Sequence, residues 1–217
     1  MATSAQDKVT SKGGWRLALE GGLHQGAGGG VGRAGQEAEK GIITLAEGAV
    51  VPFRPIESED APALKRFHRH LSSNSVHLRF FGAKPELSDK KARYFACVDG
   101  TDRFALVALD PERPEEIIAT TSFYRLGNTD RAEYAAAVED KWQGRGLGLA
   151  LTRVLIGAAL RRNVRVFTGV VLAENARMLN LLRDLGLPER LRYEKGVEYV
   201  EIELRPESRD RKPSEGS

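Results

Sequence analysis

The sequence predicts a mixed α/β fold of the α+β type, and three observations predict it. Apolar, strand-like runs at 103–109, 117–126 and 131–139 follow one another with turn residues between them. A helical apolar stripe then covers 146–163, and a β-branched strand follows at 165–172. Short turns join antiparallel neighbours, whereas a crossover helix joins parallel strands. The order therefore favours a mostly antiparallel sheet with one parallel pair and helices on both faces.

The elements before this meander are predicted from strand and cap patterns. Val50–Pro55 is expected to form the first strand. Ser58 is a favourable N-cap for a helix that runs to about Leu71, and acidic residues follow it in the first turn. In the same way, Ser88 is expected to begin a short helix that ends near Phe95.

The elements after the crossover follow from a cap and a hairpin pattern. Asn175 is expected to open a helix that ends at Gly186, because glycine is the usual residue just past a helix end. The runs 190–195 and 197–204 surround Gly196 and predict a closing hairpin.

Composition divides the chain into three parts. Residues 1–48 hold twelve of the 23 glycines and few large apolar side chains. Such a segment buries too little surface to offset the entropy of ordering, so we expect a flexible N-terminal arm. Residues 49–204 are expected to form the folded domain. Residues 205–217 mix charge with proline and serine and are expected to be a disordered tail.

Charge and hydropathy exclude several classes of protein. The net charge is only +3, whereas a nucleic-acid-binding protein usually shows a stronger basic excess. No apolar run approaches the roughly 18 residues that a membrane-spanning helix needs. The N-terminus lacks the basic and apolar blocks of a signal peptide, so a cytoplasmic protein is expected.

Histidine and cysteine patterns do not predict a metal site. His68 and His70 are two positions apart on an expected helix, where side chains point to different sides, and His77 lies among arginines. Cys97 is the single cysteine of the chain, and we expect it to be a buried apolar thiol rather than an acyl-carrying nucleophile. We therefore expect no metal.

A glycine-rich segment lies between the third strand of the meander and the long helix: Gln143-Gly144-Arg145-Gly146-Leu147-Gly148. Glycines let backbone amides approach a ligand closely, and a helix N-terminus presents unpaired amides with a positive dipole end. Together they predict a pyrophosphate site. The segment lacks the Lys-Ser or Lys-Thr of a P-loop, and its spacing differs from the dinucleotide fingerprint. A glycine-rich turn before a surface helix remains the alternative.

The residues around this segment resemble a known family. The stretch 132–148 is similar to the acetyl-CoA-binding motif of the GNAT superfamily, and 175–187 is similar to the second half of that site. The segments 54–56 and 78–82 resemble bacterial protein lysine acetyltransferases of the Pat type, which often modify acyl-CoA synthetases. The resemblance covers about residues 50–204.

The resemblance implies acetyl-CoA as co-substrate and a set of residues that bind it. Pantetheine would pair with strand backbone near Val138 and Asp140, between two strands that splay apart. The pyrophosphate would lie on the amides of the glycine-rich segment, and the Arg145 side chain would add a phosphate contact. Asn175 would contact the pantetheine arm, although helix capping explains an asparagine there equally well. The implied cofactor residues are Val138, Asp140, Gln143, Gly144, Arg145, Gly146, Leu147, Gly148 and Asn175.

Glu133 is the predicted general base. An amine with a pKa of about 10.4 must lose a proton before it can attack a thioester. Strand alternation places Glu133 on one face with Ala135 and Ala137, whose small side chains leave room for a ligand. Pat-type enzymes, which this chain resembles, carry their catalytic glutamate at this strand position. The alternative is a surface glutamate at a strand edge.

The resemblance leaves the proton donor open. Many GNAT enzymes place a tyrosine seven residues after the asparagine, and this chain has Leu182 there. Tyr193 or another group takes that role, or the thiolate leaves unaided, as its pKa near 8.5 allows.

The leading hypothesis is an N-acetyltransferase that modifies lysine side chains of proteins, such as acyl-CoA synthetases, by direct attack of the amine on acetyl-CoA. One alternative is acetylation of a small amine, and another is a non-catalytic acetyl-CoA sensor module. The expected partners are a protein with an accessible lysine or a small amine, with no nucleic acid and no membrane. A monomer or a homodimer is compatible with the sequence.

Overall fold

The structure is a computed structural model that describes residues 39–81 and 86–205. Its strands and helices alternate in the order expected for a mixed fold. In chain order they are β1 (Gly41–Thr44), β2 (Val50–Pro55), the 3-10 turn η1 (Ser58–Asp60), α4 (Ala61–His70), α5 (Ser73–Phe80), α6 (Asp89–Ala96), β3 (Arg103–Leu109), β4 (Ile117–Arg125), β5 (Arg131–Val138), the 3-10 turn η2 (Asp140–Trp142), α7 (Leu147–Arg161), β6 (Val166–Leu172), α8 (Ala176–Asp184), β7 (Glu189–Glu194) and β8 (Val197–Glu203).

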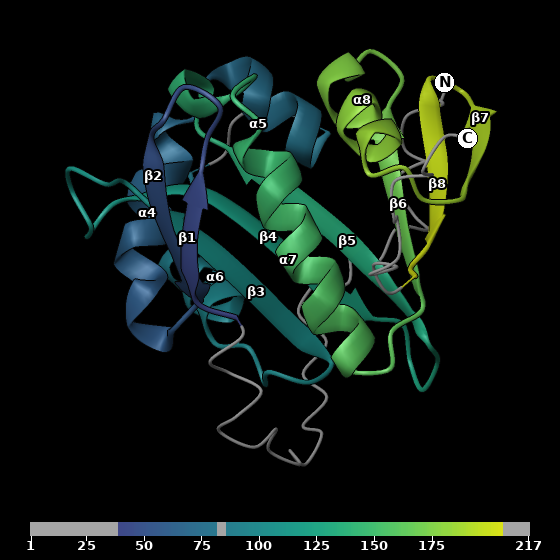
Figure 1. The fold of residues 1–217 in the computed structure, drawn as a ribbon, viewed down its shortest axis with the longest axis horizontal. Helices are drawn as coiled ribbons and strands as arrows, with labels where there is room; N and C mark the ends of the chain where they lie inside the picture. The colour runs from purple at the N-terminus through teal and green to yellow at the C-terminus, as the bar shows by residue number, and fades with distance from the viewer. Residues whose placement is uncertain (1–38, 82–85, 206–217) are drawn as a thin grey trace, which may run out of the picture.

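The strands form one 8-stranded sheet in the order β1-β2-β3-β4-β5-β6-β8-β7. Every neighbouring pair is antiparallel except β5 and β6, which are parallel and are joined by α7. In Figure 1, α7 crosses in front of β4 and β5, and β6, β8 and β7 continue the sheet beside α8. The predicted fold class is confirmed, including its single parallel pair.

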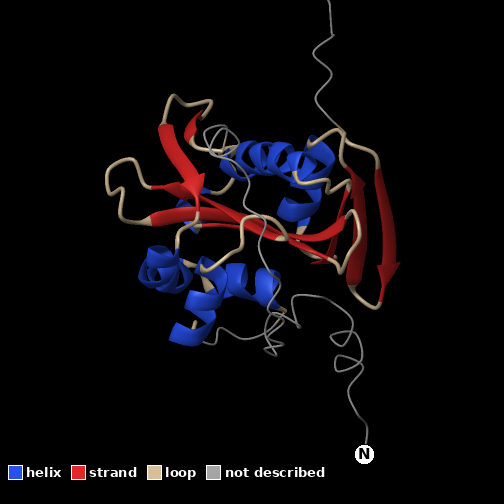
Figure 2. Cartoon of the chain, turned by 90° about the horizontal axis from the view of Figure 1, so that it is seen from below, coloured by secondary structure: helices blue, strands red, loops and turns tan. Residues whose placement is uncertain are grey.

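Helices cover both faces of the sheet and bury one apolar cluster on each. In Figure 2 the sheet is seen between the two layers of helices. One cluster joins α7 to the sheet through Leu147, Leu151, Leu155 and Phe167. The other joins α4, α5 and α6 to the opposite face and includes Phe67, Val76, Ala92 and Val107. No helix in the described ranges is long and apolar enough to cross a membrane.

Two elements differ from the sequence-based expectation. Strand β1 lies within the segment assigned to the flexible arm, where Ile43 is buried and pairs with Val51. The ordered fold therefore begins before residue 41, because a single hairpin partner is enough to bury this short apolar run. The rest of the expected arm, and the tail from 206 onward, lie outside the described residues.

Helix α5 is the second difference, since no helix was expected between those that end near Leu71 and begin at Ser88. Its sequence carries no apolar stripe, and Val76 is its only fully buried residue. Ser72 caps it by accepting a 3.1 Å hydrogen bond from the Ser75 amide. The helix is stabilised by contacts with the loop after β5. Local sequence patterns cannot predict contacts between segments this far apart in the chain.

Candidate active site

A gap opens between β5 and β6 because the two strands pair over only three positions. Arg131 lies opposite Val166, and Glu133 lies opposite Thr168, after which no further pairs form. Both strands nevertheless continue, β5 to Val138 and β6 to Leu172. The splay predicted from the resemblance is therefore present.

Strand parity shows which backbone groups of β5 face this gap. The Glu139 amide donates a 2.8 Å hydrogen bond to the Ile118 carbonyl on the β4 side. Successive residues of a strand direct their backbone groups to opposite edges, so those of Ala136 and Val138 point toward β6. The Val138 carbonyl accepts a 2.8 Å hydrogen bond from Gln143 Nε2. The amide of Val138 and both backbone groups of Ala136 thus face the space where pantetheine would pair.

The gap widens into a cavity of about 520 Å³, within the range of small-molecule sites. We call it the cofactor cavity. Its wall is built by β5, β6, the N-terminal turn of α7, and helices α5 and α8. Most of the predicted site residues line it, namely Glu133, Val138, Gln143, Gly144, Gly146, Gly148 and Asn175. Asp140, Arg145 and Leu147 do not line it, and the Leu147 side chain is fully buried in the core beneath.

The glycine-rich segment forms the turn that leads into α7. Gly146 is the N-cap residue with φ 84°, a left-handed conformation that other residues adopt only with strain. Gly148 has a different role, because a Cβ there would lie 3.1 Å from Leu181 Cδ1 on α8. The first amides of this 15-residue helix have no partners within it, so they are available to an anion, as the prediction of a pyrophosphate site requires.

Arg145 is not directed at the cofactor cavity in this structure. Its guanidinium pairs with the carboxylate of Glu47, in the turn between β1 and β2, and lies 4.3 Å from the centre of the Trp142 ring. The predicted phosphate contact of this side chain would require it to leave Glu47. Sequence reasoning could not anticipate this pair, since Glu47 belongs to the segment expected to be an arm.

Asp140 and Gln143 connect the cofactor loop to α5. The Asp140 carboxylate accepts hydrogen bonds from the Ser72 amide at 2.9 Å, from Ser72 Oγ at 2.7 Å and from Ser75 Oγ at 2.8 Å. Gln143 Nε2 donates to Ser75 Oγ at 3.0 Å, and its oxygen accepts from Arg177 on α8. The exposed Asp140 carboxylate therefore joins the turn after β5 to Ser72, the N-cap residue of α5, and to Ser75.

Asn175 caps the N-terminus of α8, which is the alternative role predicted for this residue. Its Oδ1 accepts a 3.1 Å hydrogen bond from the Met178 amide. The residue also lines the cofactor cavity, so capping and cofactor contact are compatible at this position.

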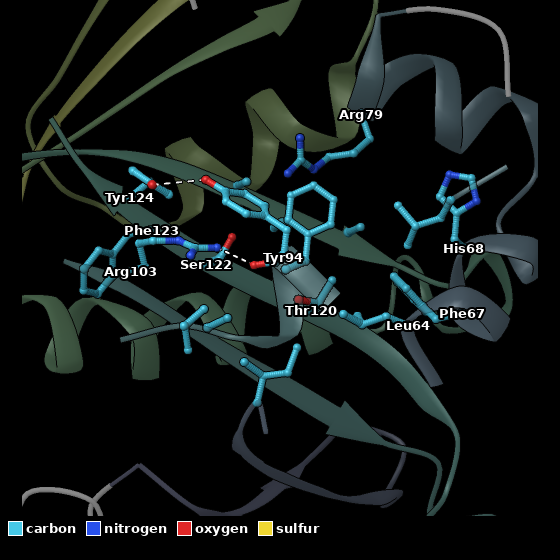
Figure 3. A pocket seen from close by; sticks show the side chains of 18 of the residues that line it. Leu64, Phe67, His68, Arg79, Tyr94, Arg103, Thr120, Ser122, Phe123 and Tyr124 are labelled. Atoms are coloured by element: carbon cyan, nitrogen blue, oxygen red, sulfur yellow. Dashed lines mark hydrogen bonds between the residues drawn. The ribbon is translucent and has the colours of Figure 1, made fainter. Parts of the chain in front are cut away.

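A second cavity of about 140 Å³ lies on the other face of the sheet, beneath α4 and α6. We call it the inner cavity. Figure 3 shows Leu64 and Phe67 on the α4 side, Tyr94 opposite them, and Arg79 reaching in from α5. Both cavities are lined by Leu71, Arg79, Glu133, Ala135, Ala136 and Ala137.

Glu133 therefore lies where the two cavities meet. The predicted alternation holds, since Ala137 packs with the cluster under α4 and α6 while Tyr134 and Val138 pack with the cluster under α7. The Arg79 guanidinium interacts electrostatically with Glu133. Burial lowers the pKa of Arg79, and the Glu133 carboxylate opposes that change. Sequence analysis missed Arg79 because nothing in the spacing relates α5 to β5.

Tyr193 does not fit the role of proton donor. It is exposed on the edge strand β7 and lines neither cavity. Leu182, the residue at the usual tyrosine position, is buried and lines the cofactor cavity. Cys97 is exposed and lines neither cavity, so the expectation of a buried thiol is wrong.

Comparisons with known proteins identify this arrangement. A sequence profile described as acetyltransferase (GNAT) domain matches residues 51–188, which is more than half of the chain. The chain belongs to the GNAT acetyltransferase family. It is accordingly an acetyl-CoA-dependent acetyltransferase, in agreement with the splayed strands and the glycine-rich turn.

Two curated relatives and one solved domain each match between 70% and 76% of this chain. Acetyltransferase PA5475 of Pseudomonas aeruginosa is 30% identical over 154 residues, which cover 70% of this chain and 83% of that protein. Acetyltransferase Pat of Mycolicibacterium smegmatis is 31% identical over 159 residues, 71% of this chain, but the chain spans only 46% of that protein's length. The solved GNAT domain of S. lividans PAT superposes with a TM-score of 0.71 at 33% identity, covering 76% of this chain and 97% of that domain.

Proposed function

We propose that this GNAT enzyme acetylates lysine side chains of proteins in the cytoplasm, acyl-CoA synthetases being a candidate class, with Glu133 as the general base. The observation that carries the proposal is the position of Glu133, which lines both cavities beside the end of the β5–β6 pairing. The likeness to Pat of M. smegmatis and to the S. lividans PAT domain supports a protein acceptor.

The cofactor cavity supplies groups of the kinds that acetyl-CoA needs. The backbone of Ala136 and the amide of Val138 face the gap, so they are suited to the amides of pantetheine. The amides of the 143–148 turn and the α7 N-terminus suit the pyrophosphate. Acetyl-CoA, when bound there, supplies the activated acetyl group as a thioester.

Glu133 would act on the acceptor amine. A lysine ammonium gives one proton to the Glu133 carboxylate, directly or through a water, and becomes nucleophilic. The amine nitrogen forms a bond to the thioester carbon, the carbon–sulfur bond breaks, and its electron pair leaves on the CoA thiolate. The second nitrogen proton passes to the thiolate or to solvent. A backbone amide of β5 that faces the gap and is not paired with pantetheine would donate to the oxyanion.

The direct test is release of CoA thiol from acetyl-CoA against a panel of proteins and small amines. Glu133→Gln is expected to lower turnover at pH 7 by about 10²-fold, the scale of general-base catalysis, with acetyl-CoA affinity retained. Glu194→Gln, on the exposed edge strand β7, serves as the matched control. Unchanged turnover in Glu133→Gln would remove this residue from the mechanism.

The same assay separates catalysis from sensing. A chain that binds acetyl-CoA by calorimetry but releases no thiol with any acceptor is a non-catalytic acetyl-CoA module. Release with small amines alone would exclude a protein acceptor.

A further inference from the structure

The inner cavity has the size and lining of a site for a compact apolar group. Its walls include Leu64, Phe67, Phe80, Leu87 and Phe95. Its volume of about 140 Å³ is close to the roughly 150 Å³ of an apolar protein cavity that holds benzene. A group as large as an aromatic ring or a branched aliphatic chain therefore fits this space.

Two opposite charges stand where the inner cavity joins the cofactor cavity. Of the residues that line both spaces in the described structure, Arg79 and Glu133 are the ones that carry a charge. The Arg79 guanidinium lies 5.1 Å from the centre of the Phe80 ring, and an arginine remains protonated even when burial lowers its pKa. The junction thus presents one anion and one cation, beside an apolar space.

The position of Arg79 is fixed by the link between α5 and the cofactor loop. Asp140 holds the first turn of α5 through Ser72 and Ser75, and Gln143 adds a further bond to Ser75. Arg79 lies in the last turn of the same helix. The helix that carries Arg79 is therefore held relative to β5 by residues of the loop that also lines the acetyl-CoA site.

We propose that this active site acetylates the α-amino group of free amino acids with apolar side chains. The inference rests on the proposed role of Glu133 and names a second class of acceptor for it. The amine would face Glu133, the α-carboxylate would pair with Arg79, and the side chain would fill the inner cavity. The ammonium group of a lysine side chain can interact with Glu133 and its methylene groups with the apolar wall, but it has no carboxylate to pair with Arg79. A zwitterionic amino acid has both an ammonium group for Glu133 and a carboxylate for Arg79.

The transfer balances with acetyl-CoA as the only co-substrate. The α-ammonium group gives one proton to Glu133, and its nitrogen attacks the thioester carbon. The new carbon–nitrogen bond replaces the carbon–sulfur bond, whose electron pair leaves on the thiolate. The second nitrogen proton goes to the thiolate or to water, and the products are an N-acetyl amino acid and CoA.

The test compares L-phenylalanine with L-phenylalaninamide, using the purified full chain, acetyl-CoA and mass detection of the acetylated product. The amide has the less basic amine, so intrinsic reactivity favours it. We expect kcat/KM for the free acid to exceed that for the amide by about tenfold or more, as for a site that pairs a charged substrate group. Arg79→Met should reduce this ratio to about one or below, and Arg79→Lys should keep part of it.

A second variant covers the case in which Arg79→Met does not fold. Ser122→Leu adds volume inside the inner cavity, where Ser122 pairs with Ala135 across β4 and β5. It should lower the rate ratio of L-phenylalanine to L-alanine.

Three results would overturn the proposal: an amide as good as the acid in the parent chain, an unchanged ratio in Arg79→Met, or an unchanged ratio in Ser122→Leu. If a lysine peptide is acetylated and no amino acid is, the proposed function stands and this inference falls. If neither is acetylated while acetyl-CoA binds, the proposed function itself fails.

Discussion

The guanidinium of Arg145 pairs with the carboxylate of Glu47, which joins the turn between β1 and β2 to the anion-binding turn before α7. Arg145 is also stacked over Trp142, so its side chain lies beside the predicted pyrophosphate site but is engaged elsewhere. We therefore predict that Glu47 competes with a cofactor phosphate for the Arg145 guanidinium. Two variants separate the two partners of Arg145.

Glu47→Gln is expected to tighten acetyl-CoA binding, because it releases Arg145 for the phosphate. The gain in affinity should be small, about two- to fivefold by calorimetry at low salt, because exposed ion pairs are weak. It should shrink as salt screens the charges. Arg145→Ala should weaken binding instead. Glu203→Gln, which breaks an exposed pair with Arg190, is the control that should change nothing. Equal affinities for all variants would show that Arg145 takes no part in cofactor binding.

Asp140→Asn is expected to destabilise the fold in a pH-dependent way. Burial acts to raise the pKa of Asp140, but hydrogen bonds from Ser72 and Ser75 outweigh it and hold this pKa below its usual value. A lowered carboxylate pKa contributes stability above the unfolded pKa of about 3.9, and that contribution is lost as pH falls through the folded pKa. Losing these charge-assisted hydrogen bonds of an exposed carboxylate should cost about 1 kcal/mol near neutral pH.

Urea unfolding of both proteins between pH 7 and pH 3 measures this effect. The difference in unfolding free energy should be largest near neutral pH and should vanish in acid. A difference that stays constant across this range would mean that the Asp140 charge does not support α5.

The sequence predicts those parts of the fold whose signals are local. The caps at Ser88 and Asn175 and the crossover around α7 are found where periodicity and cap chemistry placed them. Strand β1 and helix α5 were missed because long-range contacts stabilise them. Ile43 is buried by pairing with β2 and by the apolar cluster under α7, and Ser72 and Ser75 of α5 are bound by Asp140, which follows β5.

The candidate site shows the same division. The glycine-rich turn and Glu133 could be located because strand parity and a helix start are local patterns. The roles of Arg79 and Glu47 could not be predicted from local patterns. Only the folded chain brings Arg79 close to Glu133 and Glu47 close to Arg145. Asp140 was assigned to the cofactor through its backbone and Arg145 through its side chain. Both side chains instead bind other elements of the protein in this structure.

Gly146→Asp is expected to abolish acetyl-CoA binding, because it places a carboxylate at the mouth of the anion site. Gly146 has φ 84°, and aspartate and asparagine tolerate this conformation better than other residues do. Gly146→Asn is therefore the matched control, with nearly the same shape and strain but no charge. Calorimetry should show weaker binding for the asparagine variant and none for the aspartate variant. Equal binding by the two variants would mean that the pyrophosphate does not lie at this turn.

The last prediction concerns the proton donor, for which Tyr134 is the candidate tyrosine in the wall of the cofactor cavity. Tyr134 lines the cofactor cavity, but its hydroxyl lies 2.8 Å from Thr152 Oγ1, and Thr152 donates to the Gly148 carbonyl at 2.7 Å. The Thr152 proton is thus already used, so the Tyr134 hydroxyl must be the donor in their shared bond. Burial raises the pKa of Tyr134 to about 12, which keeps it protonated.

These contacts favour a structural role for Tyr134, and we predict that the thiolate leaves without a tyrosine donor. Tyr134→Phe should lower the unfolding free energy by about 1 kcal/mol, the contribution of one hydrogen bond, while kcat changes by less than about twofold. Tyr193→Phe, on the exposed edge strand, should change neither quantity. A fall in kcat of about tenfold or more in Tyr134→Phe, together with loss of the basic limb of its pH profile, would instead make Tyr134 the general acid. Such a loss in Tyr193→Phe would mean that β7 approaches the thioester during turnover.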